Sequence, residues 1–306
     1  MKKIYYLTSS WFCFWVKRAI DKLNEVIKIH ANEKIYCVHE LVHNSNVNNK
    51  FKELDVTFVE DIKSVKNKNA IIVFSAHWTN RKILKEAKEK FKMVYNLECP
   101  LVSRIYNNID DFIKQWINTF FYIGKRWHQE AQNILDYMDH CWITSYSFSD
   151  ITEIPNIKKE IKLAVVSQTT LNFKNISKIL KKIKTQYPRA VSAEISDICM
   201  ATFERQWIIT NNLSKFETLV VVGWKNSNNT KELVQIWNKN NKQVFFVRSL
   251  TDLIKNNKNL FKNKNVAITG WASTPNQDIR DIFDYYKEKW YKQEILSLQT
   301  KILPFD

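Results

Sequence analysis

Two patterns of apolar residues alternate along the chain. Short runs rich in β-branched and aromatic residues are each followed by a polar loop; they are KIYCV, AIIVF, FFYIG, LAVVS, TLVVVG, QVFFV and NVAIT. After several of these loops, apolar residues recur every three or four positions, as in RKILKEAKEKF, NISKILKKIKTQY, TKELVQIWNKN and DIRDIFDYYKEKW. Strands that alternate with amphipathic helices predict an α/β fold with mainly parallel sheets. In such folds, functional side chains gather in the loops beyond the carboxyl ends of the strands.

The composition is that of a folded protein in a reducing compartment. The chain has 306 residues, of which 45% are hydrophobic and 13% aromatic. No apolar run approaches the ~18–20 residues that cross a bilayer. The N-terminal MKKIYYL is short and lacks a cleavage pattern, so we expect a first strand rather than a signal peptide. Five widely spread cysteines predict no disulfide framework. We therefore expect a cytoplasmic protein without a membrane partner.

The net charge of +16 raises the question of a nucleic-acid partner. Lysine and asparagine are spread over the whole chain, as in NKNKN, KNNKN and KKIKT, and no basic arm stands out. We therefore expect no nucleic-acid partner, and steep salt dependence of DNA binding would contradict this expectation. An anionic small molecule needs only a local group of donors.

Three cysteines stand in the same sequence context. Cys13, Cys99 and Cys199 each end a strand-like run and begin an amphipathic, helix-like one, and they are 86 and then 100 residues apart. No C-x₂-C pair of the kind found in zinc sites occurs. A helix N-terminus favours negative charge and lowers a thiol pKa. The pattern therefore predicts an anionic metal–sulfur cluster held from three sides, with one iron open to substrate. We expect Cys37 and Cys141 to be small hydrophobic residues.

The near-even cysteine spacing also predicts three comparable subdomains. Their predicted ranges are 14–98, 99–195, and 196–306 together with 1–13.

Histidines follow several of the predicted strands. VHELVHN holds His39 and His43, which would share one face of a helix and could bind a metal, although His43 is better explained as a substrate ligand. VFSAHW places His77 after a strand. GKRWHQE places His128 two residues before Glu130, a reasonable pair for proton delivery.

Three further loops combine hydroxyl and amide side chains. SQTTLN provides Thr169, and GWASTP provides Ser273. GWKNSNNT provides Ser227, Asn228 and Asn229 before a predicted helix. Helix capping explains one or two of these residues. The whole set resembles an anion cradle. We therefore predict one composite site, with a cluster at its centre and a polyanion such as a diphosphate beside it.

These motifs resemble the family of 4-hydroxy-3-methylbut-2-enyl diphosphate reductases. HELVHN, CPLV, QTTL, KNS-x-NT and AST-P occur in this order, and the resemblance extends from residue 5 to about residue 285. It implies three similar α/β subdomains in a pseudo-threefold trefoil around a [4Fe–4S] cluster. The implied cluster ligands are Cys13, Cys99 and Cys199.

The resemblance also implies roles for the polar residues. Glu130 would supply the proton as the allylic C–O bond breaks, Thr169 would orient the substrate hydroxyl, and His128 would help to deliver the proton. The implied diphosphate ligands are His43, His77, Ser227, Asn228, Asn229 and Ser273. A ferredoxin or flavodoxin would supply two electrons, yielding isopentenyl and dimethylallyl diphosphates. Glu98 stands where the family has threonine, and we expect it to lower the cluster potential.

Tryptophan and glycine are the unusual residues of this chain. There are 3 glycines and 11 tryptophans, whereas an average composition would give about 21 glycines. Six tryptophans stand where the family has glycine: Trp11, Trp15, Trp78, Trp127, Trp224 and Trp271. Strain of about 1–3 kcal/mol is expected at each such site. We hypothesise that UGA codons read as glycine were translated as tryptophan, and that Trp116, Trp142, Trp207, Trp237 and Trp290 are further candidates.

Two other functions remain open at this point. A non-redox iron–sulfur hydro-lyase also uses three cysteines and an open iron, but it would consume no electrons. A degenerate, non-catalytic relative would keep the fold without the reaction. Genuine tryptophans in the turns would favour that alternative, and retention of every polar site residue argues against it.

Overall fold

The computed structural model describes residues 2–76, 79–193, 197–224, 243–256, 265–289 and 291–297. The chain forms two compact units, one from residues up to 17 and from 200 onward, the other from residues 18–199. In these described ranges, no helix is both long enough and apolar enough to cross a membrane.

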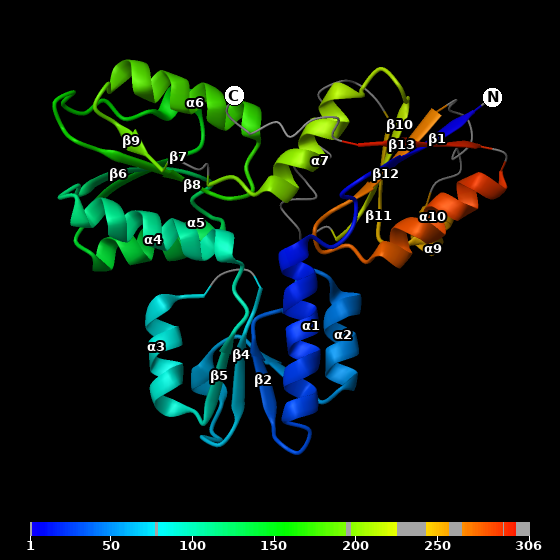
Figure 1. The fold of residues 1–306 in the computed structure, drawn as a ribbon, viewed down its shortest axis with the longest axis horizontal. Helices are drawn as coiled ribbons and strands as arrows, with labels where there is room; N and C mark the ends of the chain where they lie inside the picture. Colours follow the sequence, from blue (N-terminus) through cyan, green and yellow to red (C-terminus); the bar gives the residue numbers. More distant parts are fainter. Residues whose placement is uncertain are drawn as a thin grey trace. The chain divides into compact units, whose positions relative to one another are not determined.

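The first sheet of the 18–199 unit has four parallel strands in the order β3-β2-β4-β5 (Figure 1). The strands are β2 (Ile35–Val38), β3 (Val56–Val59), β4 (Ile71–Phe74) and β5 (Met93–Asn96). The accompanying helices are α1 (Phe14–Ile29), α2 (Ser45–Glu53), α3 (Arg81–Lys90) and the 3-10 helix η1 (Ile62–Ser64). Leu84 and Ala87 of α3 pack with Phe74 of β4 in a buried cluster, which fixes α3 on the sheet.

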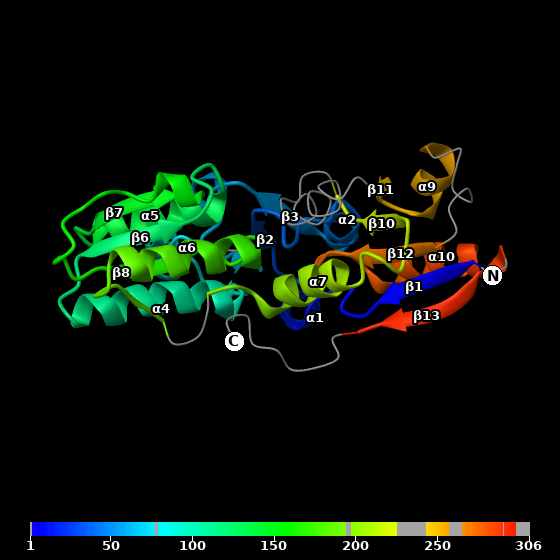
Figure 2. The ribbon, with the colours of Figure 1, turned by 90° about the horizontal axis from the view of Figure 1, so that it is seen from above.

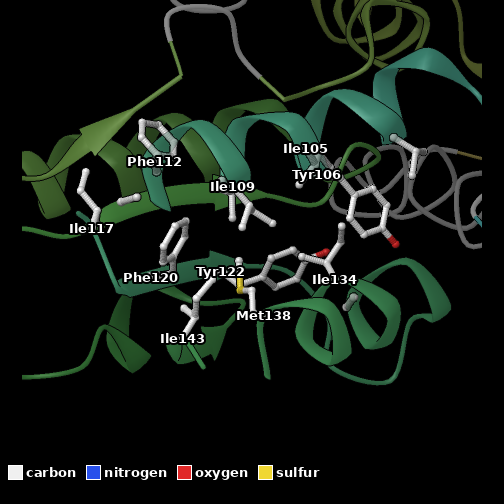
Figure 3. Packing of buried hydrophobic residues seen from close by; sticks show 14 residues of the cluster. Ile105, Tyr106, Ile109, Phe112, Ile117, Phe120, Tyr122, Ile134, Met138 and Ile143 are labelled. Atoms are coloured by element: carbon white, nitrogen blue, oxygen red, sulfur yellow. The ribbon is translucent and has the colours of Figure 1, made fainter. Parts of the chain in front are cut away.

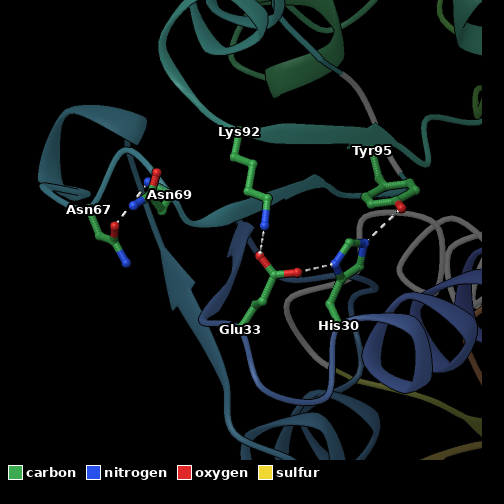
Figure 4. A network of polar contacts seen from close by, with 6 residues as sticks. All are labelled: His30, Glu33, Asn67, Asn69, Lys92 and Tyr95. Carbon is green, nitrogen blue, oxygen red and sulfur yellow. Dashed lines mark hydrogen bonds and ion pairs between the residues drawn. The ribbon is translucent and has the colours of Figure 1, made fainter.

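A polar network ties the segment after α1 to strand β5 (Figure 4). Lys92 Nζ donates to Glu33 Oε2 at 2.6 Å, and Glu33 Oε1 lies 2.8 Å from His30 Nδ1. His30 Nε2 lies 2.9 Å from the Tyr95 hydroxyl. The hydrogen bonds from Lys92 and His30 lower the pKa of Glu33. His30 therefore has a structural role.

The second sheet of this unit has the order β7-β6-β8-β9, again all parallel. Its strands are β6 (Thr119–Ile123), β7 (Thr144–Phe148), β8 (Ala164–Ser167) and β9 (Val191–Ser192). Its helices are α4 (Pro100–Lys114), α5 (Gln129–His140), α6 (Phe173–Gln186) and the 3-10 helix η2 (Ile151–Glu153). Phe120 and Tyr122 of β6 pack with α4 and α5 in one buried cluster (Figure 3). Phe121 between them points the other way, toward Tyr187 after α6.

Helices α4 and α5 end in the same way, with a tryptophan in left-handed conformation. Trp116 has φ 62° and Trp142 has φ 58°. The N–H of Trp116 donates to Ile113, and the next N–H donates to Phe112. Trp142 repeats this pattern with Asp139, and the following N–H donates to Met138. Both ends are thus Schellman motifs, in which the left-handed position is usually glycine.

The side chains around these two helix ends agree with that geometry. The apolar contacts of a Schellman motif are supplied by Phe112 with Ile117 and by Met138 with Ile143, all in the buried cluster (Figure 3). The indole rings of Trp116 and Trp142 are 92% and 93% exposed, so they contribute almost nothing to the core.

The other unit contains a five-stranded parallel sheet with the order β11-β10-β12-β1-β13. Its strands are β1 (Lys3–Leu7), β10 (Thr218–Val222), β11 (Gln243–Val247), β12 (Asn265–Gly270) and β13 (Lys292–Leu296). Its described helices are α7 (Met200–Asn211), α9 (Leu250–Asn256) and α10 (Asn276–Glu288). The N-terminal strand β1 lies between β12 and β13 (Figure 2).

The three sheets repeat one topology. In each, the first strand of the repeat is flanked by the second and third, and the fourth pairs with the third: β3-β2-β4-β5, β7-β6-β8-β9 and β11-β10-β12-β1. A cysteine follows the fourth strand every time: Cys99 after β5, Cys199 after β9 and Cys13 after β1. The expectation of three similar α/β subdomains with parallel sheets is confirmed. The predicted subdomain boundaries remain a prediction.

The apolar runs predicted the buried strands, and all seven are strands in the structure. Strands β3, β7 and β13 were not predicted, because polar residues interrupt their apolar patterns; in TSYSF of β7, four consecutive residues carry hydroxyl groups. The predicted helix TKELVQIWNKN lies outside the described residues.

Candidate functional site

The three cysteines each precede a helix, as predicted. Cys13 precedes α1, Cys99 is the N-cap of α4, and Cys199 precedes α7. Cys13 Sγ accepts a hydrogen bond from the Val16 N–H at 3.4 Å. All three residues are partly exposed. Each thiol therefore lies where helix N–H groups stabilise negative charge.

The backbone of each cysteine is bonded in an equivalent way. The N–H of Cys13 donates to Ala272, that of Cys99 to Ala76, and that of Cys199 to Thr169. These acceptors lie in the loops after β12, β4 and β8, the third strand of each repeat. The loop that carries a cysteine is thus fixed to a loop that the sequence predicts to bind substrate.

The chemistry of these donors suits an iron–sulfur cluster. None of the five cysteines forms a disulfide. Burial raises the pKa of Cys37 to about 12, and burial also raises the pKa of Cys141, as expected for residues with a packing role. Among the described residues, no group of three or more His, Cys, Asp or Glu side chains has metal-binding geometry. Cys13 belongs to one unit, and Cys99 and Cys199 belong to the other.

Glu130 and Thr169 form a buried acid–hydroxyl pair. Glu130 lies in the first turn of α5 and is 4% exposed. Its Oε1 accepts the Thr169 N–H at 2.7 Å, and its Oε2 accepts the Thr169 hydroxyl at 2.9 Å. Since Thr169 also accepts the Cys199 N–H, the carboxyl group and the cysteine loop share one anchor.

Glu130 is a carboxyl group suited to hold a proton near neutral pH. Burial raises its pKa from 4.5 to about 7, although the two hydrogen bonds from Thr169 act in the opposite direction. The nearby carboxylates of Asp197 and Glu98 raise this pKa further. A pKa close to the working pH is the property that a general acid needs.

His128 caps the helix that carries Glu130. Its Nδ1 accepts the Glu130 N–H at 3.2 Å, so a neutral ring carries its proton on Nε2. Burial, together with the neighbouring His43 and Lys125, lowers the pKa of His128 to about 4. The structure therefore brings His43, His128 and Glu130 together, while their role at a site stays a prediction.

The helical pairing of His39 and His43 is wrong. Residues 39–44 form bends, and His39 has φ 60°, which interrupts any helix. The His39 ring faces Glu60 at 3.0 Å, whereas His43 Nδ1 lies 3.7 Å from Glu40 Oε2. The two rings therefore do not form a metal-binding pair, and the role of His43 as a substrate ligand stays a prediction.

Ser273 is buried in the loop between β12 and α10. Its neighbour Thr274 has a structural role, since its hydroxyl donates to the Val222 carbonyl at 2.9 Å and accepts the Trp271 N–H at 3.0 Å. The other predicted ligands, His77, Ser227, Asn228 and Asn229, lie outside the described residues.

Two buried charged residues that bond to these loops or to the adjoining strand ends were not predicted. Asp197 accepts the Ser167 N–H, and Arg205 donates to the carbonyls of Gly270 and Trp11. An acidic residue two positions before a cysteine was the only signal in the sequence for Asp197, and nothing marked Arg205 within its helix.

The tryptophans at predicted glycine positions differ from expectation. Trp11, Trp15, Trp127, Trp224 and Trp271 are described, and none has positive φ, so the expected strain at these five does not come from a left-handed backbone. Trp78 lies outside the described residues, as do Trp237 and Trp290. The left-handed conformation falls on Trp116 and Trp142 instead.

Comparison with known proteins identifies the family. The model of the LytB protein family matches residues 4–287. A 4-hydroxy-3-methylbut-2-enyl diphosphate reductase of Buchnera aphidicola is 32% identical over 298 residues, which cover 95% of this chain and 93% of that protein. A protein of the same name from Anaplasma marginale is 29% identical, with coverage of 90% and 79%.

A solved structure has the same fold over almost the whole chain. The E-1-hydroxy-2-methyl-but-2-enyl-4-diphosphate reductase from Plasmodium falciparum superposes with a TM-score of 0.87 at 26% identity, covering 99% of this chain and 94% of that one. Its fold agrees with the three repeated parallel sheets described above. The chain belongs to the LytB family.

Proposed function

We propose that this chain is a 4-hydroxy-3-methylbut-2-enyl diphosphate reductase. It would convert (E)-4-hydroxy-3-methylbut-2-enyl diphosphate into isopentenyl and dimethylallyl diphosphates, the last step of the non-mevalonate pathway. The observation that carries this proposal is the buried Glu130–Thr169 pair, which shares an anchor with the Cys199 loop. It combines a protonated acid with a hydroxyl group at a site suited to an allylic alcohol.

The reaction needs two electrons and two protons. The allylic C–O bond breaks, the hydroxyl group leaves as water with one proton, and the second proton is added to carbon. Glu130 supplies the proton to the leaving oxygen, because its pKa of about 7 leaves much of it protonated at neutral pH. Thr169 holds the substrate hydroxyl beside that carboxyl group. His128, neutral through its lowered pKa, donates from Nε2 without adding charge.

The three helix-opening cysteines are the proposed ligands of a [4Fe–4S] cluster. When bound, such a cluster supplies electrons and an open iron that polarises the C–O bond. Thiolates at the starts of α1, α4 and α7 are stabilised by helix N–H groups, which supports Cys13, Cys99 and Cys199 as this donor set.

The diphosphate requires several donors of hydrogen bonds. We place His43, His128 and Ser273 around it, together with His77, Ser227, Asn228 and Asn229. Lys125, whose charge lowers the pKa of His128, adds positive charge near the proposed diphosphate position. A ferredoxin or flavodoxin is the proposed electron donor. Reduced thiols without disulfides are consistent with a cytoplasmic location.

The test is turnover by anaerobically prepared protein loaded with iron and sulfide. With the allylic diphosphate and reduced methyl viologen, we expect two electrons consumed per product. Glu130→Gln should lower kcat by roughly 10²–10⁴, whereas Glu153→Gln, an acid-to-amide change in the exposed η2 capping box, should not. Product formation without electron consumption would indicate a hydro-lyase, and inactivity of iron-loaded protein would indicate a degenerate relative.

A further inference from the structure

Each cysteine loop lies beside a buried charged side chain that the proposed chemistry does not use. These side chains are Glu98, Asp197 and Arg205, and each residue is at most 6% exposed. A buried charge is costly unless it is fully hydrogen-bonded. The partners of these three groups therefore indicate what each one does.

Glu98 connects the Cys99 loop to the loop after β4. Its Oε1 accepts the Thr79 N–H at 2.6 Å, and its Oε2 accepts the Ser103 hydroxyl at 2.5 Å. The guanidinium group of Arg81 lies 3.9 Å away. The next residue, Cys99, donates its N–H to Ala76 of the same loop. Residues 98–99 are thus hydrogen-bonded to both Ala76 and Thr79 of the loop after β4.

Asp197 makes the equivalent connection for Cys199. Its Oδ2 accepts the Ser167 N–H at 2.9 Å, and its Oδ1 accepts the Asn108 side-chain amide at 3.0 Å. Two residues later, the Cys199 N–H donates to Thr169. Residues 197–199 are therefore bonded at both ends to residues 167–169, which include the partner of Glu130.

Arg205 makes the third connection with the opposite charge. Its Nε donates to the Gly270 carbonyl at 3.1 Å, and its Nη2 donates to the Trp11 carbonyl at 2.5 Å. Trp11 lies two residues before Cys13, whose N–H donates to Ala272 in the loop after β12. The Arg205 guanidinium group thus connects the Cys13 loop to the end of β12, two residues before the acceptor of the Cys13 N–H.

We propose that Glu98, Asp197 and Arg205 are positioning residues, each of which fixes one cysteine loop to the end of the third strand of its repeat or to the loop that follows it. Each loop is then held by two attachments, one from the cysteine backbone and one from a charged side chain. Hydrogen bonds to charged groups are shorter and stronger than neutral ones. The orientation of each thiol is set by the protein before a cluster is bound. This geometric role of Glu98 is separate from its expected effect on cluster potential, which stays a prediction.

The test is site-resolved alkylation of the full-length, cluster-free protein with iodoacetamide, followed by peptide mass spectrometry. Glu98→Gln should accelerate modification of Cys99, Asp197→Asn that of Cys199, and Arg205→Gln that of Cys13. We expect at least about fivefold acceleration at the matching cysteine, because weakening one attachment raises the population of the open loop. The other two cysteines of the set should react at the wild-type rate.

Three controls separate positioning from other effects. Fully buried Cys37 reports global unfolding, and Glu153→Gln reports the acid-to-amide change at an unrelated capping site. Glu98→Asp keeps the charge but shortens the reach, so it should behave like Glu98→Gln. Three results would overturn the proposal. They are wild-type alkylation rates in Glu98→Asp, unchanged alkylation rates in the three main variants, and equal acceleration at all cysteines including Cys37.

A second measurement uses the iron-loaded protein. The reduced cluster should show an altered electron paramagnetic resonance spectrum in each main variant and an unaltered one in Glu153→Gln. The cluster and its reaction rest on the proposed function, whereas the alkylation pattern does not. If the reductase assay fails but alkylation is selective, the proposed function is refuted and the positioning roles are supported. If the protein is an active reductase but alkylation is not selective, only the positioning roles are refuted.

Discussion

Replacing Trp116 and Trp142 by glycine should stabilise the protein. Both residues occupy the left-handed position of a Schellman motif, with φ 62° and 58°. This conformation costs a residue with a Cβ atom about 1–2 kcal/mol. Glycine avoids that cost but loses about 0.5–1 kcal/mol more conformational entropy on folding. Little packing is lost with indole rings that are 92% and 93% exposed.

The expected net gain is therefore about 0.5–1 kcal/mol per site in the free energy of unfolding. For the double variant, the sum is about 1–2 kcal/mol if the two helix ends act independently. A unit of roughly 180 residues then gains about 2–8 °C in Tm. Urea unfolding followed by circular dichroism measures the free energy directly, and calorimetry measures Tm.

Alanine at the same positions is the matched control, because it removes the indole but keeps the Cβ atom. Trp116→Ala and Trp142→Ala should give little or no gain. Trp207→Gly should destabilise, since Trp207 lies within helix α7 with its ring 5.6 Å from that of Phe203. Equal stabilisation by alanine and glycine would place the effect in the exposed indole and refute the backbone argument.

Three further outcomes follow from the site. Glu130→Gln should remove a pH dependence of stability. Burial raises the pKa of Glu130 from 4.5 to about 7, so the free energy of unfolding of the wild type falls by about 3 kcal/mol as the pH rises through that window. In thermal unfolding, the variant should therefore be more stable relative to the wild type at pH 8 than at pH 4. Thr169→Val should lower kcat. The Thr169 hydroxyl lowers the pKa of Glu130 in the wild type, so its removal should shift the alkaline limb of the pH–rate profile to higher pH. An alkaline limb at the wild-type pH would contradict the pairing of Thr169 with Glu130. Cys→Ser changes at 13, 99 or 199 should each reduce bound iron, measured colorimetrically, whereas Cys37→Ser and Cys141→Ser should retain it.

The sequence predicted those parts of the fold that depend on local patterns. Buried strands such as AIIVF and TLVVVG are continuous apolar runs, and Cys99 stands at a boundary that both flanking patterns mark. The pairing of Asp197 with Ser167 is different, because it depends on residues that come together only when β8 and the segment before α7 are packed. Backbone conformation was equally inaccessible: the left-handed turns at Trp116 and Trp142 follow from where helices α4 and α5 end.

The positions of the left-handed tryptophans bear on whether the chain is an intact enzyme. A relative that had lost its reaction would be expected to change first in the loops that bind substrate. Here Glu130 keeps its hydrogen bonds to Thr169 and His128 within the proposed site. Trp116 and Trp142 precede β6 and β7, so they lie at the amino ends of these parallel strands, whereas Thr169 follows the carboxyl end of β8. Tryptophan thus stands at glycine-favouring positions outside the proposed site as well as in its loops, which indicates a chain-wide cause such as UGA read as glycine. UGG codons at these two positions, or tryptophan in the corresponding tryptic peptides of the native protein, would refute that reading. Glycine there would leave the proposed site within an ordinary, unstrained member of its family.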